Sequence, residues 1–494
     1  MKKLLGNKKA LRAVIIAVVC ASVVAAGLCI FGVFSDGRTD YSLSLTLDSD
    51  AMTLRAAAKI DYKNNTGAEL DNIKFNLYAN AFREGAAVKP YFESDVNSAY
   101  PDGVNYGGME IKSVRAENDL QYSVSGKDKN VLDAKLDKPL KKGGKKTVEI
   151  VYELKIPKTN MRFGYYGGII NLTNFFPSVC VYENGGFVEC LYLPTGDPFY
   201  SETADFKVEL RTDREYTAAH SGDLKSEKTE GKGKIFKFTG EKIRDFALCL
   251  SEKFEVKTAK SGNTTVKYFA LKESGEESAI RLGNGLQTAK NALDFFGGYY
   301  FKYPYKTYCV AETYLTAGGM EYPNLVLISR ALREKDKEAV VVHETAHQWF
   351  YGIVGNDNLN HAWMDEGLSE FSTELYFLRN GKPLKANEYH HFNLGESRRF
   401  EEIVREINPG NVSMDKNIGD FVSNYEYVAL TYSRGHMMFS DICRILGNEP
   451  FQKAMRLYVK RNKYKIAKKT NLVDALNECA QKDIRADIAK WINL

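Results

Sequence analysis

Residues 340–350 read VVVHETAHQWF. Within this apolar segment, His343 and His347 stand four residues apart. An α-helix turns once in about 3.6 residues, so both imidazoles would leave the same helix face and could hold one zinc ion. Glu344 is offset around the helix and free to contact a water molecule on the metal. We therefore predict a helix over about 335–351 that carries a metal centre.

A third ligand is needed, because catalytic zinc normally takes three protein ligands and one water molecule. The segment WMDEGLSEF, residues 363–371, offers Glu366, which eighteen residues separate from His347. This length allows a loop and the start of a second helix, predicted over about 365–379. Glu370, one turn further on, could hydrogen-bond a liganding histidine. The predicted zinc ligands are His343, His347 and Glu366.

The metal centre is a specific signal. With 7 histidines in the chain, a chance HExxH motif has a probability under about one in a hundred. Two imidazoles and a carboxylate suit Zn(2+), although the sequence does not exclude other divalent metals. The remaining histidines lack ligand spacing, and we interpret them as surface or packing residues: His220, His361, His390, His391 and His436.

The first 34 residues form a basic tail and an apolar run. Residues 1–12 contain five basic side chains, and residues 13–34 contain 22 residues without a charge. At about 1.5 Å per residue this run could cross a membrane with its basic side in the cytoplasm. We predict a cytoplasmic tail, a single-pass transmembrane helix and an extracellular remainder at the cell membrane. The alternative is a signal peptide cleaved near Val24-Ala25-Ala26.

The rest of the chain has no net charge. Beyond residue 34 there are 63 basic and 63 acidic residues, which argues against a nucleic-acid partner. Six cysteines lie in this part, and their spacing does not decide whether any of them form disulfides.

The periodicity of the chain changes near residue 255. Tyr41, Leu43, Leu45 and Leu47 alternate with polar residues, as expected of strands with one buried face. Helical patterns dominate after this point. We predict an α+β protein with an antiparallel β-domain over 35–255 and a mixed α/β domain over 256–494.

Three motifs together resemble the zinc signature of the gluzincin aminopeptidases of the aminopeptidase N type. The first is HETAHQWFYGIVG with WMDEGLSEF downstream. The second is Gly318-Gly319-Met320-Glu321, similar to the GxMEN motif of that family, although Tyr322-Pro323 stands in place of its Asn. The third is Tyr432-Ser433-Arg434-Gly435, like the Tyr-x-Lys-Gly segment of the family.

The resemblance implies a thermolysin-like catalytic domain after the β-domain, in a short form without the large C-terminal helical domain. It also implies an aminopeptidase in which zinc-bound water is activated by Glu344 and the oxyanion is stabilised by Tyr432. Glu321 would bind the free N-terminus of a peptide substrate, beside Gly318, Gly319 and Met320. Two alternatives stay open: a thermolysin-type endopeptidase with the same metal set, and an inactive surface-binding protein on this fold.

Overall fold

The structure is a computed structural model that describes residues 37–273, 276–407 and 412–494. The tail predicted over 1–12 and the transmembrane segment predicted over 13–34 lie outside these ranges. Within them, every helix is too short or too polar to cross a membrane.

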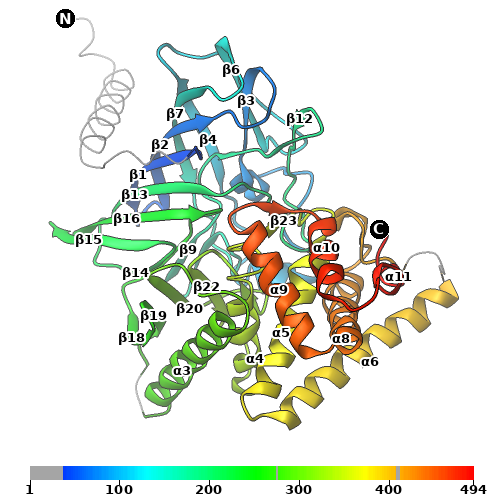
Figure 1. Cartoon of the computed structure of the whole chain (residues 1–494). Coiled ribbons are helices and arrows are strands. Elements are labelled where there is room, and N and C mark those ends of the chain that lie inside the picture. The colour runs from blue at the N-terminus through cyan, green and yellow to red at the C-terminus, as the bar shows by residue number, and fades with distance from the viewer. Residues whose placement is uncertain (1–36, 274–275, 408–411) are drawn as a thin grey trace, which may run out of the picture.

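The first part of the chain folds into a β-domain, at the top of Figure 1. Its largest sheet has seven strands in the order β15, β16, β13, β1, β2, β7 and β4. These strands are Asp223–Glu230, Gly233–Ile243, Ala204–Arg211, Asp40–Asp48, Thr53–Lys63, Lys145–Lys155 and Gly108–Arg115. Neighbours pair antiparallel, except that β1 and β13 run parallel.

Smaller sheets complete this domain. One has the order β10, β3, β6 and β5, which are Ser178–Val179, Leu70–Asn76, Val131–Leu140 and Tyr122–Ser125. Another has the order β14, β17, β9 and β8, which are Thr217–His220, Leu248–Ser251, Ile169–Leu172 and Gly164–Tyr166. The hairpin β11–β12 (Tyr182–Glu183, Gly186–Phe187) and the short helices η1 (Tyr78–Phe82), η2 (Glu93–Asp95) and α2 (Val96–Ala99) connect them.

The alternation read from the sequence is confirmed in β1. Tyr41, Leu43, Leu45 and Leu47 are all buried, and the residues between them are half-exposed. The buried face of this sheet therefore supplies a continuous part of the core of the β-domain.

A five-stranded sheet begins the second part of the chain. Its order is β18, β19, β20, β22 and β21, which are Phe254–Ser261, Thr264–Leu271, Thr307–Thr313, Leu325–Ser329 and Gly319–Met320. The three central strands run parallel, and the outer strands β18 and β21 are antiparallel to their neighbours. The domain boundary predicted at 255/256 falls inside β18.

Both faces of this sheet are buried. In β20, Cys309 and Ala311 belong to the core shared with the β-domain, whereas Tyr308 and Val310 belong to the core under the helices. The sheet is thus the layer that joins the two parts of the chain. This arrangement explains why β20 is apolar without alternation.

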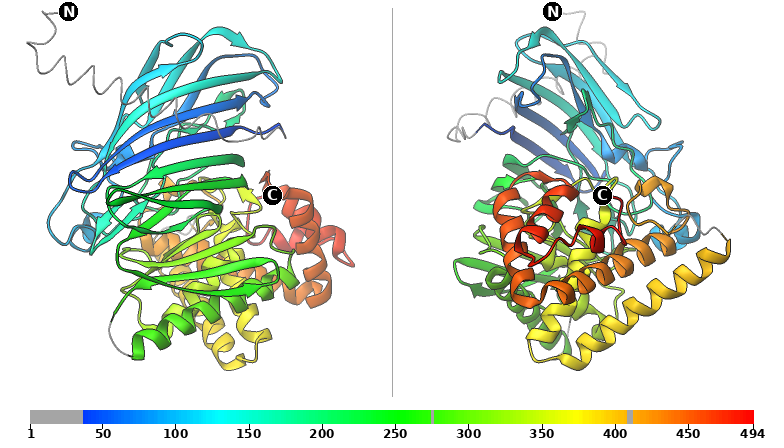
Figure 2. Two further views of the ribbon diagram at one scale, coloured as in Figure 1. Left: turned by 90° about the vertical axis from the view of Figure 1, so that its left-hand side faces the viewer. Right: turned by 45° about the vertical axis from the view of Figure 1, so that its right-hand side comes forward.

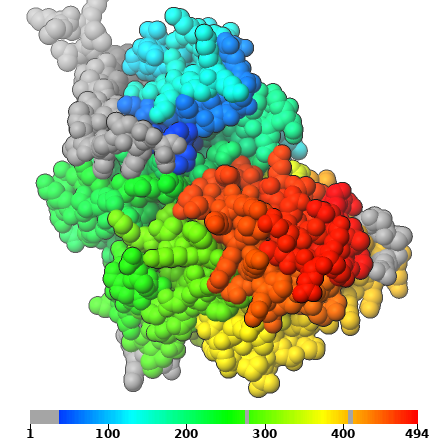
Figure 3. Space-filling model, viewed as in Figure 1, coloured from blue at the N-terminus to red at the C-terminus, as the bar shows by residue number. Residues whose placement is uncertain are grey.

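The helices pack on the face of this sheet that is turned away from the β-domain (Figures 1 and 2). In chain order they are α3 (Glu276–Tyr299), α4 (Glu334–Ala346), η3 (Ala362–Met364), α5 (Glu366–Arg379), α6 (Pro383–Ile407), η4 (Ile418–Asp420), α7 (Asn424–Tyr427), the π-helical η5 (Val428–Arg434), α8 (Gly435–Leu446), α9 (Asn448–Asn462), α10 (Lys469–Cys479) and α11 (Arg485–Ile488). The paired short strands β23 (Gly355–Asn356) and β24 (Ile466–Ala467) tie α9 and α10 to the loop after α4. In Figure 3 these last helices, in orange and red, lie directly below the β-domain.

The helix α4 ends sooner than predicted, at Ala346 instead of near 351. His347 caps it, and the amide of Gly352 donates to the carbonyl of His347. Tyr351 then takes a positive φ of 114°, which turns the chain away from the helix axis. The ring of His347 therefore projects from the last turn.

The helices α5 and α8 approach closely at two glycines. A methyl group on Gly367 would lie 2.9 Å from the Cα of Gly435, and one on Gly435 would lie 2.9 Å from the Cα of Gly367. These are the glycines of the DEGL and Tyr-x-Arg-Gly motifs, so the two motifs meet in space. Their contact fixes the distance between α5 and the segment that carries Tyr432.

We expect Gly367→Ala and Gly435→Ala each to lower the free energy of unfolding by about 1–3 kcal/mol, because the added methyl group forces the helices apart. Urea denaturation followed by circular dichroism measures this change. Gly395→Ala on α6 is the matched control: no atom lies within 4 Å of its added methyl group, so it should be neutral or stabilise by up to ~1 kcal/mol. Equal effects at all three positions would contradict a tight contact.

Candidate metal centre and catalytic cleft

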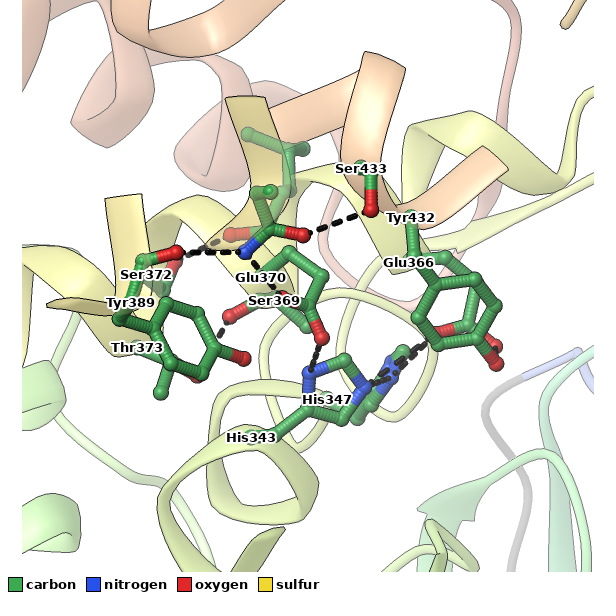
Figure 4. Close-up of polar contacts among 12 residues, drawn as sticks. His343, His347, Glu366, Ser369, Glu370, Ser372, Thr373, Tyr389, Tyr432 and Ser433 are labelled. Atoms are coloured by element: carbon green, nitrogen blue, oxygen red, sulfur yellow. Dashed lines mark hydrogen bonds and ion pairs between the residues drawn. The ribbon is translucent and has the colours of Figure 1, made fainter. Parts of the chain in front are cut away.

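The structure brings the three predicted zinc ligands together (Figure 4). The Nε2 atoms of His343 and His347 lie 3.0 Å apart, and Oε2 of Glu366 lies 3.2 Å and 3.1 Å from them, respectively. All three side chains are buried. The histidines come from the last turn of α4 and its cap, and Glu366 is the first residue of α5.

The oxygen atoms behind these ligands fit a cation. Nδ1 of His347 lies 3.0 Å from the carbonyl oxygen of Phe350, and Nδ1 of His343 lies 3.1 Å from Oε1 of Glu370. Because both oxygens are acceptors, each neutral ring carries its hydrogen on Nδ1 and presents a lone pair at Nε2. Three lone pairs thus converge on one point, with spacings near the ~3.4 Å between ligands of a tetrahedral zinc ion.

Glu370 is itself held in place. Its Oε2 accepts from Nδ2 of Asn393 on α6 at 3.2 Å, and Ser433 donates to Oδ1 of Asn393 at 2.8 Å. The neighbouring Tyr432 donates to Oε1 of Glu366 at 2.5 Å, and its ring stacks on the ring of His343 with centroids 5.8 Å apart. The π-helical segment η5 therefore places the Tyr432 hydroxyl beside the ligand set, as π-helical turns often do at functional sites.

Glu344 lies next to the ligands and depends on a glycine. It is buried, and its Oε2 finds no hydrogen-bond partner among the described residues. Burial raises the pKa of Glu344 to about 7. A methyl group on Gly319 would lie 2.2 Å from Oε1 of Glu344, whereas one on Gly318 would come no closer than 3.8 Å to any atom. The absence of a side chain at Gly319 thus leaves space beside β21 for the Glu344 carboxylate.

Glu321 follows β21 and is a buried carboxylate for which the structure shows no salt bridge among the described residues. Its Oε1 accepts no hydrogen bond from the described residues. Burial, and then the charges of Asp197 and Glu344, raise the pKa of Glu321 well above its ordinary value. An ammonium group beside Glu321 would supply the missing positive charge.

The loop that carries Glu321 is tied to the zinc-binding segment through Gln348. Nε2 of Gln348 donates to the carbonyl of Tyr322 at 3.1 Å, and Oε1 of Gln348 accepts from the amide of Asn324 at 2.8 Å. Tyr322, which stands where the resembled motif has Asn, is buried. The residue after the second histidine therefore sets the position of the Glu321 loop relative to α4.

The side chain of Met320, a predicted substrate contact, lies outside the cleft. Met320 is buried in the core beneath the sheet and does not line the cleft. The alternation along β21 is the reason, because consecutive side chains of a strand point to opposite faces. Gly319 faces Glu344, and Met320 consequently faces the opposite way.

A cleft of about 1110 Å³ lies between the β-domain and the helices, and it is lined by His343, His347, Glu366, Glu344, Glu321 and Tyr432. The cleft also contains Asp197 and Arg162 from the β-domain, which the sequence analysis missed. They form an ion pair, and Arg162 lies 5.2 Å over the ring of Phe199. Neither residue stands in a recognisable motif, so only the fold brings them to the metal centre. Tyr427 also lines the cleft, and its hydroxyl has no partner among the described residues.

Residues 284–491 match the peptidase family M1 domain. This part of the chain is therefore similar to peptidase family M1. The matched range contains the HExxH helix, Glu366 and Tyr432, and the resemblance stated from the motifs is confirmed.

Curated proteins that this chain is similar to are aminopeptidases. The chain is 28% identical over 301 residues to aminopeptidase 2, mitochondrial, of Saccharomyces cerevisiae. This match covers 58% of this chain and 31% of that protein. The chain is 26% identical over 318 residues to the puromycin-sensitive aminopeptidase of Caenorhabditis elegans, covering 60% and 32%. The matched segment thus spans about a third of the length of each relative.

Solved structures match nearly the whole chain. The M1 zinc metallopeptidase of Deinococcus radiodurans superposes with a TM-score of 0.62 at 15% identity, over 92% of this chain and 93% of that one. A mutant of the same enzyme bound to a Tyr-Ser-Ala substrate gives a TM-score of 0.63 at 16% identity, over 94% and 96%. These likenesses confirm the predicted fold, in which a β-domain is followed by a mixed α/β domain.

We expect Gly319→Ala to lower kcat for hydrolysis of an aminoacyl reporter amide by about 10²-fold, because the methyl group displaces the Glu344 carboxylate. Gly318→Ala is the matched control and should stay within a few-fold of the unmodified chain, since its methyl group meets only Val340 at 3.8 Å. Steady-state kinetics with both variants at equal zinc content measures the difference. Equal losses would contradict the assigned contact.

Proposed function

We propose that this chain is a zinc-dependent aminopeptidase that removes residues from the free N-termini of peptides. The observation that carries the proposal is the combination of the HExxH ligand set with a buried Glu321 in the same cleft, whose Oε1 has no hydrogen-bond partner among the described residues. An endopeptidase does not bind a free N-terminus, so it does not require an unpaired anionic group beside the scissile bond. The curated relatives of the matched segment are aminopeptidases, which supports the same reading.

Each of the chain's own residues in the cleft has a separate role in the proposed reaction. Glu321 pairs with the substrate α-ammonium and so sets which peptide bond reaches the metal. The open edge of β21 can hold the peptide by main-chain hydrogen bonds. Glu344 takes a proton from the attacking water and passes it to the leaving amine. Tyr432 turns its hydroxyl from Glu366 to the carbonyl oxygen as that oxygen gains charge. Bound zinc supplies Lewis-acid polarisation of the carbonyl and acidifies water.

The first test compares free and N-acetylated peptides. We expect the zinc-loaded protein to hydrolyse aminoacyl amides and free peptides, to lose activity with a chelator, and to leave acetylated peptides uncut. Glu321→Gln should lower kcat/KM for free peptides by about 10²-fold or more, because it removes one partner of a buried charge pair. Equal cleavage of acetylated and free peptides would favour the endopeptidase. Zinc-loaded protein inactive on both would favour a binding protein.

A second test separates the two tyrosines of the cleft. Tyr432→Phe should lower kcat by about 10²–10³-fold with little change in KM, as expected when a donor to the developing oxyanion is removed. Tyr427→Phe is the control, because Tyr427 packs edge-on against Tyr432 at 5.7 Å but makes no contact with Glu366 that the structure shows. A larger loss of kcat in Tyr427→Phe would assign the donor to Tyr427.

We also propose that residues 13–34 anchor the protein in the cell membrane with the catalytic domain outside. The support is the length of the apolar run and the basic residues before it. The full chain should stay with membranes after alkaline carbonate extraction and be digested when protease is added to intact cells. Release of a chain that begins just after Ala26 would instead show a cleaved signal peptide.

A further inference from the structure

Among the described residues, a second group of metal-ligating side chains lies outside the catalytic centre. It consists of Glu374, His390 and His436, whose ligand atoms all lie within 4.8 Å of one another. Oε2 of Glu374 lies 2.5 Å from Nε2 of His436 and 3.1 Å from Nδ1 of His390. Three different helices supply these residues, α5, α6 and α8.

This group is separate from the catalytic ligands but shares a helix with them. Glu366, Glu370 and Glu374 follow one another at four-residue spacing along α5, which places them on one face. Eight residues of helix correspond to about 12 Å along the axis. The second group therefore lies two turns from the catalytic centre, with Glu370 between the two.

The burial of the group suits a site that an ion can enter. The side chain of His436 is 0% exposed, whereas those of Glu374 and His390 are 18% and 27% exposed. Solvent thus reaches the group from the side of α6 and leaves positions for water ligands. Although burial opposes it, hydrogen bonds and charges from His436 and then His390 lower the pKa of Glu374, so its carboxylate is ionised at neutral pH.

The kind of ligand follows from the donor atoms. Two imidazoles and one carboxylate select zinc and neighbouring first-row divalent ions over magnesium and calcium, which prefer oxygen ligands. We propose that Glu374, His390 and His436 form a second site for a divalent transition-metal ion, which links α5, α6 and α8. The ion takes no part in the reaction and stabilises the helical half of the catalytic domain.

The affinity of this site should be lower than that of the catalytic centre. Nδ1 of His436 has no acceptor among the described residues, whereas the ligand His347 has the carbonyl of Phe350 behind it. An acceptor behind a liganding histidine typically raises metal affinity by about 10–100-fold. The ring of His436 is instead positioned by packing against Phe371 and Tyr389.

The number of bound metal ions tests the proposal. The full chain is stripped with a chelator, dialysed against micromolar ZnCl₂ and assayed for zinc per chain, and CoCl₂ provides a spectroscopic signal for each site. We expect two ions in the unmodified chain and one in His390→Ala. The second ion should raise the apparent Tm of the unmodified chain but not that of His390→Ala. Peptidase activity should stay unchanged in His390→Ala.

His391→Ala is the matched control. His391 is the exposed neighbour of His390, and its Nδ1 lies 2.8 Å from the carbonyl of Asn387 in its own helix. This variant should keep both ions. Glu366→Ala should lose the catalytic ion and keep the second, so that the two sites are counted independently. A single ion in the unmodified chain, or equal zinc content in His390→Ala and the unmodified chain, would overturn the second site without bearing on the catalytic one.

Discussion

The convergence of three lone pairs on one point is the constraint on which the rest of the catalytic domain depends. His343 and His347 come from one helix end and Glu366 from the start of another, and their ligand atoms lie 3.0–3.2 Å apart. Without a cation, such an arrangement is repulsive for neutral imidazoles and a carboxylate. The helices must therefore be held from outside the ligand set, and close packing does this. The contact between Gly367 and Gly435 fixes the distance of α5 from α8.

Hydrogen bonds between elements explain why the catalytic groups, which lie on different elements, keep a fixed geometry. Gln348 connects the Glu321 loop to the end of α4 by two hydrogen bonds. Asn393 connects Glu370 to Ser433, the neighbour of Tyr432. Each connection joins an element that lines the cleft to a second element of the fold. The hydrogen bonds of Gln348 and Asn393 thus hold these elements in a single arrangement.

Local sequence patterns predicted part of the ligand set and part of the β-domain core. Four-residue spacing placed His343 and His347 on one face, and alternation placed Tyr41 to Leu47 in the core, because both depend on nearest neighbours along the chain. Properties that depend on distant segments were not accessible. Asp197 reaches the cleft from the β-domain, and His390 and His436 meet at Glu374 although 45 residues separate them in the chain. The early end of α4 was also missed, because Tyr351 adopts a backbone conformation that its type rarely takes.

The carboxylates that cluster in the cleft affect both substrate binding and product release in the proposed reaction. Glu321, Glu344 and Glu366 are buried close together. Burial, and then the charges of Asp197, Glu344 and Glu366, raise the pKa of Glu321. Such a site favours cations, which suits a divalent metal and the ammonium of a peptide N-terminus. The peptide carbonyl that reacts is neutral, but the amino acid released from it carries a carboxylate at the same place. Glu344 and Glu366 repel that group, so the charges that orient the substrate also weaken the binding of the product.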